Sequence, residues 1–246
     1  MKNELVSISE IIKQGWELYI ANLQNFLLPI ALMLILPIII TILEYYNYFN
    51  LILFIFILTI SIFISLWISV FLIELINKTH NKEKFDIKNL YNIAFQKIPS
   101  YLWVSFLTGL ATILGLFLLI IPFIIFSVWF AFAPYINVLE NKNNKGWLAL
   151  KNSRELVRGY WGKTFWRLLL PPLFVYLIVM IIIIGLTYAM TGGEVDLATP
   201  NSSANLILNG LTTVIFSFLS PLFIAFVIIL YNNLKQVKSR QNKKSA

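Results

Sequence analysis

Residues 101–139 contain no charged side chain and no histidine, and this segment most constrains the fold. An α-helix rises about 1.5 Å per residue, and the hydrocarbon core of a bilayer is about 30 Å thick. The segment is therefore nearly long enough to cross a membrane twice. We expect a helical hairpin with helices over residues 101–119 and 122–139 and a turn near residues 115–122. A re-entrant pair is the alternative, and it requires other helices to cover its irregular backbone.

The remainder of the chain has the same membrane character. Hydrophobic residues make up 59% of the 246 residues and charged residues 12%, whereas soluble domains are about 45–50% apolar and about 25% charged. Four further apolar runs predict spans over residues 26–43, 51–76, 164–190 and 206–231. We therefore predict an all-α, polytopic membrane protein, in which residues 1–246 form a single integral membrane domain with six transmembrane helices.

An amphipathic stretch precedes each of the first, third and fifth predicted spans. Apolar residues recur at helical spacing in all three, with charged residues between them, which is typical of helices that lie in the membrane interface. Asp86 is suited to cap the second stretch, and we expect that stretch to end at Pro99. Trp16, Trp103 and Trp161 occupy similar places in the three units. Internal duplication and three independent amphipathic linkers both explain this pattern.

The positions of the basic residues predict the orientation in the membrane. All 19 Lys and Arg residues lie before the first span, between the second and third, between the fourth span and Arg167 in the fifth, or in a basic tail over residues 235–246. The other three connections contain none. Cytoplasmic loops are enriched in Lys and Arg, so we expect cytoplasmic N and C termini. Because these bases border apolar runs, the net charge of +8 indicates membrane orientation rather than nucleic-acid binding.

Residue types that carry chemistry are scarce. The chain has no cysteine and one histidine, His80, which we interpret as a solvated loop residue between lysines. No Gly-rich phosphate loop, metal-ligand set or catalytic carboxylate pair can be assembled, so we predict no enzymatic activity, cofactor or metal. Glu74 lies near the cytoplasmic end of the second span. We interpret it as an interfacial carboxylate, with a proton relay as the alternative.

The third amphipathic stretch provides one candidate contact surface. Lys151, Arg154 and Arg158 share one side of the predicted helix. Bases beside a membrane attract anionic headgroups, each by roughly 1 kcal/mol near the surface, so these residues are candidates for contact with anionic lipids or with a membrane protein partner. The alternative is that they only set the topology.

A polar face within the predicted spans provides the second candidate. Ser61, Ser65 and Ser69 recur every four residues on the second span, and Asn209 and Thr213 have the same spacing on the sixth. Small polar residues in this pattern serve either close helix packing or the lining of a transport pathway.

Residues 118–169 carry a resemblance to a known family. The matching features are Ile121-Pro122, the segment from Phe132 to Tyr135, Val138 to Glu140, the run Ala149-Leu150-Lys151-Asn152-Ser153, and Glu155-Leu156-Val157-Arg158-Gly159 followed by Tyr160 and Trp161. With these, the chain resembles the membrane domain attached to some glycerophosphoryl diester phosphodiesterases and the related YciC-type bacterial membrane proteins. It departs from many of these relatives at Phe123, where they have glycine after the Ile-Pro pair.

The resemblance implies a stand-alone membrane module, because the phosphodiesterase of that family is a separate soluble barrel, and it carries over no catalytic residue. Together with the abundance of Ile, Asn and Lys, which is typical of AT-rich bacterial genomes, it places the chain in a bacterial plasma membrane. We therefore expect a non-enzymatic module that organises or assists lipid or protein partners of the cell envelope. A small-molecule or lipid transporter component is the alternative.

Overall fold

The computed structural model describes residues 5–45, 50–140, 146–190 and 203–245, and every regular element within these ranges is a helix. Six helical segments of the described chain are long and apolar enough to cross a membrane. This confirms the predicted all-α class and the six candidate spans. The helices are α1 (Ile8–Ala21), α2 (Leu23–Tyr45), α3 (Leu51–His80), α4 (Ile87–Phe117), α5 (Ile120–Phe130), α6 (Ala133–Leu139), α7 (Trp147–Val157), α8 (Trp161–Met190) and α9 (Ser203–Ser245).

The three amphipathic stretches differ in how they join the spans. The first is a separate helix, α1, whose N-terminus is capped by the Ser7 hydroxyl accepting from the Glu10 amide. The third is also separate, since α7 and α8 are joined by a short link in which Gly159 has a φ of +84°. The second is continuous with its span in α4. Whether these segments lie in the membrane interface stays a prediction.

Pro99 lies inside α4, so the prediction that a helix ends there is wrong. A proline removes one backbone hydrogen bond, and neighbouring helices compensate by fixing the helix on both sides of it. Ala94, Ile98 and Val104 are all buried, and α4 packs against α3, α5 and α6. Packing against neighbouring helices therefore keeps α4 continuous across Pro99.

The hairpin predicted for residues 101–139 is present, and its turn falls within the predicted range. The helix α4 ends at Phe117 and α5 begins at Ile120, with Leu119 at a φ of +121°. The two arms approach closely at Gly115, where an added Cβ would lie 3.0 Å from the backbone of Phe123. The tip is apolar and open, because Phe117 is 84% exposed and Leu119 75%. Such a tip suits hydrocarbon better than water.

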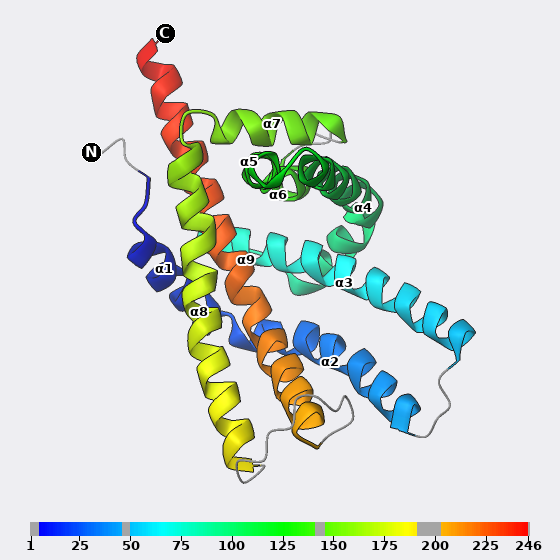
Figure 1. The fold of residues 1–246 in the computed structure, drawn as a ribbon. Helices are drawn as coiled ribbons and strands as arrows, with labels where there is room; N and C mark the ends of the chain where they lie inside the picture. Colours follow the sequence, from blue (N-terminus) through cyan, green and yellow to red (C-terminus); the bar gives the residue numbers. More distant parts are fainter. Residues whose placement is uncertain (1–4, 46–49, 141–145, 191–202, 246) are drawn as a thin grey trace.

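Three helical hairpins, α2–α3, α4–α5 and α8–α9, diverge from a shared end of the molecule (Figure 1). We call this end the base. Its core consists of buried side chains within residues 68–76 of α3, 128–138 of α5 and α6, and 222–237 of α9. Described basic residues such as Lys97, Lys235 and Lys238 lie at the base, while the far halves of the hairpins expose apolar side chains such as Ile52 and Ile181. Apolar exposure of this extent is what a lipid environment accommodates.

Candidate functional site

The short helix α7 is held firmly across the base. In Figure 1 it runs across the direction of α8 and α9, beside α5 and α6. One face of it is buried through Ala149, Leu150 and Val157. The buried hydroxyl of Ser153 accepts from the Phe132 amide at 3.2 Å and donates to the Trp129 carbonyl at 2.7 Å. These bonds satisfy backbone groups that the break between α5 and α6 leaves free, and they fix α7 to that break.

An adjacent face of α7, continued by Arg158 just beyond the end of the helix, carries the three bases predicted from the sequence. Lys151, Arg154 and Arg158 are all exposed, and Trp147, which is 70% exposed, shares their face. At 3.6 residues per turn the four side chains fall within an arc of about 60°. Trp147 was not predicted as part of this surface, although its i, i+4, i+7, i+11 spacing with the bases was readable in the sequence. A tryptophan among bases is typical of the headgroup layer.

The three bases differ in their surroundings. Arg154 stacks over the ring of Trp129, with its guanidinium carbon 4.5 Å from the ring centroid. Arg158 lies 3.7 Å from the Glu155 carboxylate, and because both side chains are well exposed this pair contributes little to stability. Lys238 of the basic tail donates to the Arg158 carbonyl at 2.8 Å, which brings α9 beside the end of α7. Basic side chains of both α7 and α9 therefore contribute to this surface.

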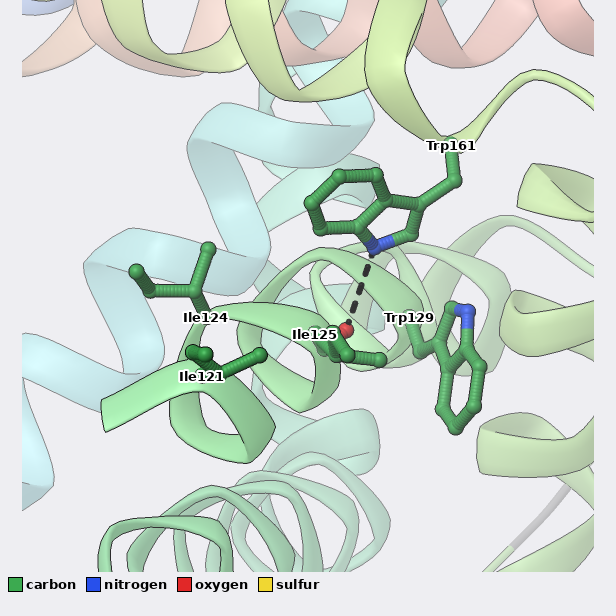
Figure 2. A pocket seen from close by; sticks show the side chains of 5 residues that line it. All are labelled: Ile121, Ile124, Ile125, Trp129 and Trp161. Carbon is green, nitrogen blue, oxygen red and sulfur yellow. Dashed lines mark hydrogen bonds between the residues drawn. The ribbon is translucent and has the colours of Figure 1, made fainter. Parts of the chain in front are cut away.

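An apolar groove adjoins this basic face. It has a volume of about 490 Å³ and is lined by Ile121, Ile124, Ile125 and Trp129 of α5 and by Trp161 at the start of α8. Figure 2 shows Trp161 lying over α5, where its indole N–H donates to the Ile125 carbonyl at 3.4 Å. Trp129 belongs both to the groove and to the stack with Arg154. Trp129 therefore links the apolar groove to the cationic side chain of Arg154.

A network of charged residues joins the helices of the base. Lys97 of α4 donates to the Glu74 carboxylate of α3 and, at 2.6 Å, to the Val138 carbonyl of α6. The interpretation of Glu74 as an interfacial carboxylate missed this partner, because Glu74 is only 6% exposed and lies within the protein. Glu140 accepts from the Tyr231 hydroxyl at 2.8 Å and from Lys235 at 2.9 Å. Each carboxylate thus has a cation beside it.

His80 is the last residue of α3 rather than part of a loop. Its side chain lines a small polar hollow of about 220 Å³ together with Gln14 of α1 and Asn233 of α9. The prediction that His80 lies in a loop is therefore wrong, and its side chain is partly buried. Within the described ranges, no three His, Asp or Glu side chains are close enough together to bind a metal ion.

The second predicted surface, the polar face of the spans, is used locally. Ser61 donates to the Ile57 carbonyl, Ser69 to that of Ser65, and Thr213 to that of Asn209, each at 2.8 Å. These three bonds lie within single helices, as is common for Ser and Thr in membrane helices. The Ser69 hydroxyl is also hydrogen-bonded to the Tyr101 hydroxyl of α4, so this position joins α3 to α4.

Comparison with known proteins adds no relative. No family model, curated protein or solved structure matches the chain. The residues that carry the resemblance described above lie on α5, α6 and α7 and at the start of α8, which are the elements that build the groove and the basic face.

Proposed function

We propose that the chain is a non-enzymatic membrane module that organises or assists lipid or protein partners of a bacterial envelope, and that the exposed face of α7 is its contact with anionic headgroups. One observation carries this proposal. Trp147, Lys151, Arg154 and Arg158 share one exposed face at a helix whose adjacent face is buried in the base. A helix fixed in this way presents its charges without a further cost in backbone ordering.

The proposed location and orientation follow from the sequence. Described basic residues, such as Lys97 and Lys235, lie at the base, which supports the proposal that this end faces the cytoplasmic side of a plasma membrane, where anionic lipids create a negative potential. The resemblance to phosphodiesterase membrane domains supports a stand-alone module of this kind. A transporter component is the second candidate. The hydrogen bond between Ser69 of α3 and Tyr101 of α4 supports a packing role for the predicted polar face instead.

Single cysteines test the orientation, since the natural chain has none. We expect substitutions at Asn47 and Ser202 to react with a membrane-impermeant maleimide in intact cells. Those at Ser9 and Asn81 should react only after permeabilisation, because they border basic segments. Labelling of Asn81 from outside would contradict the orientation. Reaction of Leu119→Cys from outside would show that the α4–α5 hairpin crosses fully, and protection would favour the re-entrant alternative.

Neutralising the α7 face tests the headgroup contact. We expect the triple variant Lys151→Gln, Arg154→Gln and Arg158→Gln to lose affinity for phosphatidylglycerol by a factor of ten to roughly one hundred, since each base contributes about 1 kcal/mol. Native mass spectrometry of the full chain in neutral detergent micelles measures the retained phosphatidylglycerol against phosphatidylcholine with the same acyl chains.

The matched control removes the same charge elsewhere at the base. Lys82, Lys84 and Lys88 are exposed and lie between α3 and α4 or on the first turn of α4. Their triple glutamine variant should retain phosphatidylglycerol nearly as well as the natural chain. Equal losses in the two triple variants would mean that total charge alone attracts the lipid, and the α7 face would then have no special role.

A further inference from the structure

The apolar groove between α5 and α8 combines two features that suit an amphiphile. Its lining of three isoleucines and two tryptophans offers almost no polar atoms, and its volume of about 490 Å³ falls within the range of small-molecule sites. It opens beside the exposed apolar tip of the α4–α5 hairpin, where Ile121 is 71% exposed. In a bilayer such an open apolar hollow is filled by hydrocarbon, because water would find no hydrogen-bond partners there.

Two contacts hold the Arg154 side chain next to the groove. The Trp129 ring holds the Arg154 guanidinium 4.5 Å from its centroid, and the backbone carbonyl of Trp129 accepts from Ser153, one residue before Arg154 on α7. Stacking uses the planar face of a guanidinium and leaves its N–H edges free to form paired hydrogen bonds with a phosphate. The contact with Trp129 therefore holds the Arg154 guanidinium, a group that can bind phosphate, next to the apolar groove.

A cation next to an apolar groove suits a ligand that has a negatively charged group and a hydrocarbon chain. We infer that the groove holds an acyl chain of an anionic phospholipid whose phosphate binds Arg154. This inference rests on the proposed headgroup contact of α7. It adds a defined binding place for the acyl chain of the lipid and a single residue, Arg154, for its phosphate. Trp161 borders the groove on the α8 side, where its indole N–H donates to the Ile125 carbonyl. Residues of both α5 and α8 would therefore contact the bound lipid.

The test separates the acyl chain from the headgroup. The full chain in neutral detergent micelles is given phosphatidylglycerol or phosphatidylcholine with brominated acyl chains, and lipid retention and tryptophan quenching are measured. Ile124→Phe narrows the groove and should reduce retention and quenching by both lipids, while Ile113→Phe, on the exposed side of α4, should change neither. Neither substitution adds a tryptophan to the fluorescence signal. Ile121→Phe narrows the groove from its open end and replaces Ile124→Phe if that variant does not fold.

In the Arg154→Gln variant the acyl chain of the lipid should still bind in the groove. The preference for phosphatidylglycerol over phosphatidylcholine should fall by about fivefold. Unchanged retention and quenching in both groove-narrowing variants would overturn the inference, while a loss in the α7 triple variant would then still support the headgroup contact. An unchanged preference in Arg154→Gln would overturn the assignment of an anionic lipid. If the triple variant also retained phosphatidylglycerol fully, the proposed function would fail with it.

Discussion

Replacing Lys97 with methionine should destabilise the protein by about 3 kcal/mol. The Glu74 carboxylate is buried, and Lys97 is the cation beside it and also the donor to the Val138 carbonyl. Removing one partner of a buried ion pair leaves an uncompensated charge, which costs about 3–5 kcal/mol. Because the Lys97 side chain is about one-third exposed, the lower end of that range applies.

The partner substitution should be far milder. Glu74→Gln removes the charge but keeps an amide oxygen that can accept from Lys97, and Lys97 is exposed enough to remain solvated. We expect a loss of about 1 kcal/mol for it. The double variant Glu74→Met and Lys97→Met has no buried charge and should regain most of the stability that Lys97→Met alone loses.

Thermal melting in mild detergent, followed by tryptophan fluorescence, measures these differences. The expected order of stability is the natural chain, then Glu74→Gln or the double variant, then Lys97→Met. A Lys97→Met protein as stable as the natural chain would show that Glu74 is protonated or hydrated without its partner. In that case the pair would not be what joins α3, α4 and α6.

The six spans were predictable because the bilayer simplifies the problem. Within hydrocarbon every backbone group must be satisfied inside the segment, so a sufficiently long apolar run has one stable form, the helix. The turn of the α4–α5 hairpin followed from the same argument, since residues 101–139 are too long for one crossing and too short for two with a wide loop. Length and hydropathy suffice for these features.

The partner of Glu74 could not be predicted from the sequence. Lys97 is 23 positions away on a different helix, and whether the two meet depends on how α3 and α4 rotate about their own axes. Periodicity could not supply that rotation, because α3 is apolar around most of its circumference and buries a continuous run at residues 70–76. Lys97 was assigned to a cytoplasmic connection, whereas it lies in the middle of the described helix α4.

The candidate site was predicted in part. Three bases on one side of an amphipathic stretch gave the exposed face of α7, because i, i+3 and i+7 spacing places residues together on any helix. The groove depends on the α5–α8 contact, which has no sequence signal of its own. The break between α5 and α6 does have one, because Pro134 lies in the first turn of α6, where proline is favoured. The pairing of Arg154 with Trp129, 25 positions apart, is equally a product of the tertiary fold.

The second large effect is expected at Gly15, where α1 crosses α9 with no room for a side chain. A Cβ at this position would lie 2.5 Å from two ring atoms of Phe226 and 3.7 Å from Leu222. Phe226 is itself buried, so its ring cannot move aside without disturbing the base. Gly15→Leu should therefore separate α1 from α9 and lower the melting temperature strongly, by the few kcal/mol typical of severe overpacking. Gly109→Leu, in the open face of α4, is the matched control and should fold normally.

A change of sign distinguishes this clash from an ordinary helix effect. Alanine is a better helix former than glycine by about 0.8–1.0 kcal/mol, so Gly15→Ala gains that amount and loses about 1–3 kcal/mol to the clash, and it should be destabilising overall. In a Phe226→Ala background the ring is gone, and the same Gly15→Ala change should become stabilising. If Gly15→Ala had the same effect in both backgrounds, the two residues would not be coupled, and α1 would not depend on this contact to stay on the base.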